Sequence, residues 1–344
     1  MPLLLDTARF GSAVDLHGAN CVTIGLVNNM PDAALQATER QFLDLIRAAT
    51  ADAVVRLKLF SIAEVPRADR MRDELSVRYR DISALWNTRL DGLIVTGTEP
   101  RTAALKDEPY WPVLTKLVDW ARENTASTIW SCLAAHAAVL HADGIERRPL
   151  AEKLFGVFDF EAVAGDRLMT GVAPPLRAPH SRYNDLPETA LASSGYRLLS
   201  RSAAAGVDTF ARAERSSALF LFFQGHPEYE AETLIREYRR DVGRFLRGER
   251  EQYPAPPRDY LNEEAAALAE AFRVHAVAER CARLIAEFPR KAIEAGLENT
   301  WRHSAVGIYR NWINYLKDRK AERRALKMPA QRSRDALRVG GSAR

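Results

Sequence analysis

The stretch STIWSCLAAHAAVLHADGI, residues 127–145, holds a short apolar β run that passes directly into an alanine-rich helical run. Cys132 stands at the junction. A strand that turns sharply into a helix lifts the side chain at the turn out of the sheet and points free helix N–H groups at whatever that side chain attacks. Because a helix N-terminus favours negative charge, it stabilises a thiolate and a developing oxyanion. The stretch predicts a nucleophilic cysteine, with a small buried core cysteine as the alternative.

The same alternation of strand and helix continues outward through the first half of the chain. Short apolar runs bounded by turn signals predict strands at 21–27, 54–60, 92–96 and 127–131, and helical patterns occupy 35–48, 82–86 and 112–122. This order predicts an α/β fold with a doubly wound, mostly parallel sheet and helices on both faces. After residue 150, shorter strands with hairpin-like spacing predict an antiparallel extension, and C-terminal helices begin near residue 230.

A second chemical segment follows a later strand. In QGHPEYE, residues 224–230, Pro227 keeps its neighbours extended, so His226 and Glu228 point the same way. A carboxylate beside an imidazole fixes its tautomer and stabilises the imidazolium. With Cys132 these residues compose a Cys-His-Glu triad; the alternatives are a loop histidine and a carboxylate placed for the helix dipole. His180, in APHSRY, is interpreted as lying in a polar loop with several donors.

Composition limits the class of protein. The 344 residues carry a net charge of +4, but residues 317–344 hold ten Lys or Arg against three Asp or Glu, so this end is basic and the rest is acidic. We expect an N-terminal extension at 1–16, one catalytic domain at 17–316 and a basic, flexible tail at 317–344. Three scattered cysteines and the lack of a long apolar run or basic leader predict a cytoplasmic protein. No histidine spacing indicates a metal site.

In joint order, the segments NNMPDAALQATERQFLDLI, DGLIVTGTEP, EPYWPVL, STIWSCLAAHAAV, AEKLFGVF, APHSRYNDLP, QGHPEYEAETLIREYRRD and NTWRHSAVGIYRNWINYL resemble one family. They are similar to the homoserine O-acyltransferases of methionine biosynthesis, the homoserine O-succinyltransferase family, relatives of the class I glutamine amidotransferases. The resemblance implies a flavodoxin-like fold and ping-pong transfer of an acyl group from acyl-CoA, used as a substrate with no bound cofactor, to the hydroxyl of L-homoserine.

The resemblance also implies roles for individual residues. Cys132 would carry the acyl group as a thioester, and His226, oriented by Glu228, would act as general base. The backbone N–H of Leu133 would contribute to the oxyanion hole. The substrate-contacting residues would be Lys153, Ser181 and Arg240, the last holding the homoserine carboxylate with its planar fork of donors. The family would further imply a homodimer. The basic tail is interpreted as a solvated extension, with contact to nucleic acid or anionic lipid as the alternative, so we expect no nucleic-acid or membrane partner.

Two positions depart from the family pattern. The lysine that usually follows the Met30-Pro31 pair is absent. Arg101 stands at the acyl-donor position, where the family has glycine for succinyl and glutamate for acetyl donors. A cation there would attract the free carboxylate of succinyl-CoA, so succinyl transfer is favoured and acetyl transfer is the alternative. A Cys-His-Glu amidase or glutaminase-like hydrolase, and a binding protein that has lost activity, stay open as further alternatives.

Overall fold

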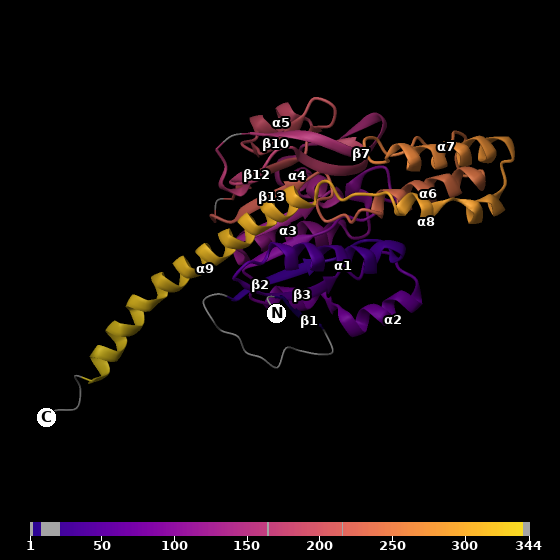
Figure 1. Ribbon diagram of the computed structural model, residues 1–344. Helices are drawn as coiled ribbons and strands as arrows, with labels where there is room; N and C mark the ends of the chain where they lie inside the picture. The colour runs from indigo at the N-terminus through magenta and orange to yellow at the C-terminus, as the bar shows by residue number, and fades with distance from the viewer. Residues whose placement is uncertain (1–2, 8–20, 164, 215, 340–344) are drawn as a thin grey trace.

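A nine-stranded sheet forms the centre of the molecule, seen in a computed structural model that describes residues 3–7, 21–163, 165–214 and 216–339, with side chains up to residue 326 (Figure 1). The strands lie in the order β1-β3-β2-β5-β6-β13-β12-β9, and β4 pairs with β3. The strands are β1 (Leu3–Asp6), β2 (Cys21–Val27), β3 (Val54–Ser61), β4 (Arg80–Asp81), β5 (Gly92–Val95), β6 (Ser127–Ser131), β9 (Arg197–Leu198), β12 (Thr209–Ala213) and β13 (Leu219–Phe223).

The five central strands are parallel and follow the flavodoxin-like order 2-1-3-4-5, counted along β3-β2-β5-β6-β13. The apolar runs at 21–27, 54–60, 92–96 and 127–131 are therefore confirmed as neighbouring strands. In β5, β6 and β13 every residue is buried, as expected for strands covered on both faces. The loops that leave β2, β5, β6 and β13 all emerge at one sheet edge, where sites of this fold class collect.

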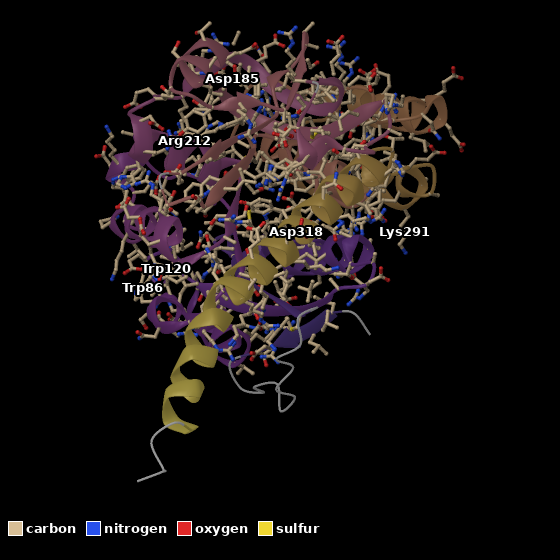
Figure 2. The ribbon with its side chains drawn as sticks, turned by 90° about the vertical axis from the view of Figure 1, so that its left-hand side faces the viewer. Trp86, Trp120, Asp185, Arg212, Lys291 and Asp318 are labelled. Atoms are coloured by element: carbon tan, nitrogen blue, oxygen red, sulfur yellow. The ribbon has the colours of Figure 1, made fainter. Side chains whose placement is uncertain are left out.

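Helices cover both faces of this sheet. On one face, α1 (Asp32–Ala49) and the first half of α9 (Arg302–Val339) pack in a common core that includes Phe42 and Trp312. On the other face, α3 (Trp111–Asn124), α4 (Leu133–Asp143) and the 3-10 turn η1 (Ile82–Asn87) share a second core. The Trp86 ring of η1 meets the Trp120 ring of α3 edge to face at 5.9 Å, near one edge of the molecule (Figure 2).

The predicted antiparallel extension divides into two parts. Strands β12 and β9 do extend the central sheet, whereas β7 (Arg148–Ala162), β8 (Leu176–Asp185), β10 (Ser200–Ser202) and β11 (Gly206–Val207) form a separate four-stranded sheet. The interpretation of APHSRY as a polar loop is wrong, because these residues lie within β8. His180 has no exposed surface, and its Nδ1 accepts a hydrogen bond from Arg182 Nε. A polar residue can be buried in a strand when it has such a partner, and the sequence pattern does not reveal the partner.

A helical lobe projects from one side of the molecule (Figure 1). It contains α6 (Thr233–Leu246), α7 (Glu263–Ala278), η4 (Ala282–Glu287) and α8 (Arg290–Glu294), which share a third core with Phe155 and Val157 of β7. The remaining short elements are α2 (Asp69–Arg78), η2 (Leu105–Asp107), η3 (Arg167–Met169) and α5 (Glu188–Ser193). The lobe matters for the site because α6 follows directly from the QGHPEYE segment.

The predicted boundary at residues 16 and 17 lies outside the described residues, whereas the boundary at residue 317 falls within helix α9. Strand β1, in the expected N-terminal extension, pairs in parallel with β3. Helix α9 runs through the boundary at residue 317 to Val339, crossing the body near Asp318 and extending beyond it (Figures 1 and 2). Lys320 on this helix donates to the Asp91 carboxylate at 2.7 Å and to the Cys21 carbonyl at 2.6 Å. The first turns after residue 317 are thereby attached to the domain.

Candidate active site

Cys132 occupies the sharp turn between β6 and α4. Its backbone has φ 52° and ψ −116°, a conformation that costs a non-glycine residue about 1–3 kcal/mol. The Cys132 N–H donates to the Phe223 carbonyl of β13 at 2.7 Å, and its own carbonyl accepts from Ala135 N–H at 2.9 Å. The turn is therefore fixed between a strand and a helix, and the side chain stays partly exposed. Cys132 is therefore not buried in the core, and its backbone is fixed by hydrogen bonds.

The loop after β5 lies against this turn. A Cβ atom on Gly97 would be 2.6 Å from Leu133 Cβ and 3.0 Å from Leu133 N, so only glycine allows this approach. Among the described residues, no hydrogen bond occupies the Leu133 N–H, which belongs to the first turn of α4. Buried Ala134 and Ala135 give the helix a narrow start. An N–H group without a hydrogen-bond partner among the described residues is thus present beside the cysteine, at Leu133, where the resemblance implies an oxyanion donor.

His226 and Glu228 lie together in the loop after β13. His226 Nδ1 is 2.9 Å from Glu228 Oε1, and the side chains are 8% and 3% exposed. Burial by itself disfavours the charged imidazole, but the Cys132 thiolate, the Glu228 carboxylate and hydrogen bonds to both raise the pKa of His226 well above 6.5. His226 is therefore in contact with Glu228 and interacts electrostatically with Cys132, and both neighbours favour the charged imidazole.

Tyr229 and Glu237 belong to the site although the sequence did not single them out. The Tyr229 ring stacks on the His226 ring with centroids 4.2 Å apart and planes 13° apart. Its hydroxyl donates to Glu237 Oε1 at 2.7 Å, and its carbonyl accepts from Trp301 Nε1 at 2.9 Å. The position of Tyr229 one residue after Glu228 was the only available signal. Stacking and anchoring together fix the plane of the imidazole.

The three predicted substrate-contacting residues converge on two carboxylates of α6. Lys153 Nζ lies 2.8 Å from Asp241 Oδ2 and 3.9 Å from Glu237 Oε2. Ser181 Oγ donates to Glu237, and Arg240 is paired with both Glu237 at 3.8 Å and Asp241 at 3.4 Å. Lys153, Arg240 and Arg244 hold the pKa of Asp241 below its usual value despite burial. Through Tyr229, this charged cluster is connected to the imidazole.

Arg101 lies on the loop after β5 with an exposed side chain. Its backbone N–H donates to Glu108 Oε1 at 2.6 Å, and Thr102 donates to the same oxygen through both N–H, at 2.8 Å, and Oγ1. Its neighbour Glu99 pairs with Arg244 of α6 at 3.1 Å. The loop is thus held at its backbone, while the Arg101 guanidinium extends toward solvent.

A buried polar group lies behind the base. Gly225 N–H donates to Asp208 Oδ1 at 2.8 Å, and this oxygen lies 3.4 Å from His180 Nε2. His226 N–H donates to the Pro179 carbonyl at 2.9 Å. Burial, with the Arg182 and His226 charges, lowers the pKa of His180 well below 6.5, so this histidine is neutral. His180 supports the loop rather than exchanging protons with substrate.

Within the described part of the chain, no three His, Cys, Asp or Glu side chains are grouped as metal ligands, and no helix is long and apolar enough to cross a membrane. The described site holds a cysteine, a histidine paired with a glutamate, and a cluster of opposite charges. Such a set suits acyl transfer between a thiol and a second nucleophile.

Comparisons with known proteins point the same way. The family model described as homoserine O-succinyltransferase matches residues 12–323. The chain is 52% identical to the homoserine O-succinyltransferase of Rhodopseudomonas palustris over 295 residues, covering 86% of this chain and 88% of the relative. It is 50% identical to that of Bradyrhizobium japonicum over 298 residues, covering 86% and 90%. A solved glutamine amidotransferase from Methylobacillus flagellatus is 17% identical, covers 86% of this chain and 95% of its own, and has a TM-score of 0.47.

Proposed function

The chain belongs to the homoserine O-succinyltransferase family, and we propose that it moves a succinyl group from succinyl-CoA to the hydroxyl of L-homoserine through a Cys132 thioester. The observation that supports this most is the contact of His226 with Glu228, next to the turn that holds Cys132, at the carboxyl edge of a flavodoxin-like sheet. Family membership makes the protein an acyltransferase of methionine biosynthesis. We further propose the roles of Cys132, His226 and Glu228 in this reaction.

The first half-reaction loads the cysteine. The Cys132 thiolate attacks the thioester carbonyl of succinyl-CoA, forming a carbon–sulfur bond and a tetrahedral oxyanion. The Leu133 N–H, at the positive end of α4, stabilises that oxyanion. When the intermediate collapses, the bond to the CoA sulfur breaks, and the His226 imidazolium gives its proton to that sulfur. Free CoA leaves, and Cys132 carries the succinyl group.

The second half-reaction unloads it. The neutral His226 imidazole accepts the proton of the homoserine hydroxyl as the oxygen attacks the Cys132 thioester carbonyl. The Glu228 carboxylate, 2.9 Å from Nδ1, stabilises the imidazolium that forms. Collapse breaks the carbon–sulfur bond, and the thiolate–imidazolium pair is restored. The sum is O-succinylhomoserine plus CoA, with no net oxidation and no proton left over.

The charged cluster beside the base suits an amino acid as acceptor. A zwitterion has one charge of each sign, and the cluster has both: Arg240 and Lys153 against Glu237 and Asp241. The Arg240 side chain is 48% exposed, so its guanidinium can pair with the homoserine α-carboxylate. Ser181, bound to Glu237, lies on the same side. We propose that these residues position homoserine with its hydroxyl toward His226.

The test is the mass that the protein gains in the absence of acceptor. Brief exposure to succinyl-CoA should add one succinyl group, homoserine should remove it, and Cys132→Ala should add none. Addition of acetyl from acetyl-CoA at equal or greater rate would instead favour the acetyl alternative. Hydrolysis of glutamine without use of any acyl-CoA would reject acyl transfer in favour of an amidase.

A further inference from the structure

His136 lies on the helix that begins at the nucleophile. Its N–H donates to the Cys132 carbonyl at 3.3 Å, so it lies one turn of α4 beyond the cysteine. His136 is 4% exposed, and its Nε2 lies 2.9 Å from Gln224 Oε1. Gln224 follows the last residue of β13 and stands two residues before His226. The His136–Gln224 contact therefore joins the helix of the cysteine to the loop of the base.

The Gln224 side chain is fixed by four hydrogen bonds. Its Oε1 accepts from Leu186 N–H at 3.0 Å as well as from His136 Nε2. Its Nε2 donates to the Val207 carbonyl at 2.6 Å and to Asp185 at 3.2 Å. Since the Leu186 N–H needs an acceptor and the Val207 carbonyl needs a donor, the amide can face only one way. His136 Nε2 must then carry the proton, and the ring is held by a partner that cannot turn.

A second link joins the same two segments through the backbone. The Cys132 N–H donates to the Phe223 carbonyl at 2.7 Å, and Phe223 directly precedes Gln224. Through Gln224 and His136 the contacts close into a ring that returns to the Cys132 carbonyl. Two links at different points keep the start of α4 from pivoting about a single hydrogen bond.

The loop that carries the base is fixed independently of α4. The Gly225 N–H donates to Asp208 Oδ1 at 2.8 Å, and the His226 N–H donates to the Pro179 carbonyl at 2.9 Å. A Cβ on Gly225 would lie 2.8 Å from both Asp208 Oδ1 and His180 Nε2, so the backbone is closely packed there. A shift of α4 would therefore change the separation between the sulfur and the imidazole.

We propose that His136 is a positioning residue, whose hydrogen bond to Gln224 keeps the cysteine sulfur within reach of the imidazole of the base. This inference rests on the proposed acyl transfer, in which that imidazole serves both half-reactions. A displacement of about 1 Å between reacting groups can cost about 100-fold in rate. Because His136 is buried, we expect it to affect kcat and not the KM for either substrate.

His136 acts through a hydrogen bond and not through charge. Burial and the Arg182 charge lower the pKa of His136 to about 3, so its imidazole is neutral under assay conditions. A substitution that removes the ring therefore removes no charge near Cys132. If the pH at which the Cys132 thiolate forms then changes, the cause is the position of the sulfur relative to its charged partner.

The experiment measures two properties of the wild type, His136→Leu and His136→Gln. The first is kcat for succinyl-CoA with homoserine, and the second is the pH midpoint of Cys132 alkylation by iodoacetamide, followed by the mass of the peptide that contains Cys132. His136→Leu loses the donor and should lower kcat by about 10-fold to 100-fold. It should also raise the alkylation midpoint by about one pH unit, toward that of an ordinary thiol. His136→Gln can place an amide N–H where Nε2 lies and should restore both properties.

Two further variants complete the design. His141→Leu makes the same change on the same helix, at a ring that contacts Asp119 at 3.1 Å and not the loop of the base, and should alter neither property. His136→Asn is too short to reach Gln224 and is expected to behave as His136→Leu does. It takes the place of His136→Leu if the leucine variant does not fold.

Three results would overturn the proposal. They are an unchanged kcat in the variant that lacks the donor, an unchanged alkylation midpoint in that variant, and a His136→Gln variant as impaired as His136→Leu, which would assign His136 to packing alone. If the wild type transfers no acyl group, the proposed function itself fails. The two failures are distinguishable because alkylation of Cys132 requires neither acyl-CoA nor homoserine.

Discussion

Replacing Glu228 with glutamine tests the triad most directly. The carboxylate is 3% exposed and accepts from His226 Nδ1 at 2.9 Å. Two unit charges about 4 Å apart interact by about 4 kcal/mol at an effective dielectric constant of 20. A neutral amide keeps part of this through an ordinary hydrogen bond, so we expect a loss of about 2–4 kcal/mol of imidazolium stabilisation. This corresponds to a decrease in kcat/KM of about 30-fold to 1,000-fold.

The assay follows release of free CoA thiol from succinyl-CoA with homoserine present. Glu230→Gln is the matched control, because Glu230 lies two residues away and contacts Arg40 at 3.9 Å rather than the imidazole. It should retain activity within threefold. If Glu228→Gln also retains activity within threefold while folded, Glu228 does not stabilise the base, and the triad is reduced to a Cys132–His226 pair.

Three further changes test other parts of the site. Gly97→Ala places a Cβ 2.6 Å from Leu133 Cβ and should lower kcat about 100-fold by displacing the loop after β5. The control is Gly307→Ala on α9, whose added Cβ would meet only Val172 and should leave kcat unchanged. Arg101→Glu should shift preference from succinyl-CoA toward acetyl-CoA, and an unchanged donor ratio would show that this side chain does not face the donor. Burial and Arg182 lower the pKa of His136 to about 3, although its hydrogen bond to Gln224 opposes this. The pKa of His136 in the folded protein is therefore lower than its pKa of about 6.5 in the unfolded chain, so the unfolded chain binds the proton first. The free energy of unfolding should then decrease by about 2 kcal/mol as the pH falls from 7.5 to 5. His136→Gln should remove that part of the slope in denaturant titrations at each pH, and an unaltered slope would contradict the assignment.

The central sheet could be predicted because its strands are apolar runs bounded by turn residues. Strands buried on both faces have apolar residues at nearly every position, which makes such runs easy to recognise. Strand β8 could not, because its polar residues are satisfied inside the protein. Arg182, which is 4% exposed, donates to Asp185 of the same strand and to the Ala205 carbonyl, which lies 23 residues further along the chain. A pattern of polar residues predicts exposure only when such partners are lacking.

The placement of Cys132 and His226 at one sheet edge could be predicted because each follows a strand, and the ends of parallel strands meet at one edge. Tyr229 and Glu237 were missed for a different reason. Stacking on His226 depends on the path of the chain after Pro227, and the Glu237 contact depends on where α6 lies.

The loop that carries His226 is fixed by hydrogen bonds to three separate parts of the fold. His226 N–H is fixed to Pro179 of β8, Gly225 N–H to Asp208 beside β12, and the Tyr229 carbonyl to Trp301 before α9. Each anchor comes from a separate element, so no single element positions the imidazole. An orientation set by three anchors loses little entropy when substrate arrives, and the nucleophile contributes its own fixed geometry through the strained turn at Cys132. In the proposed mechanism the same imidazole reaches the CoA sulfur first and the acceptor hydroxyl afterwards, so one fixed orientation of the ring would serve both half-reactions.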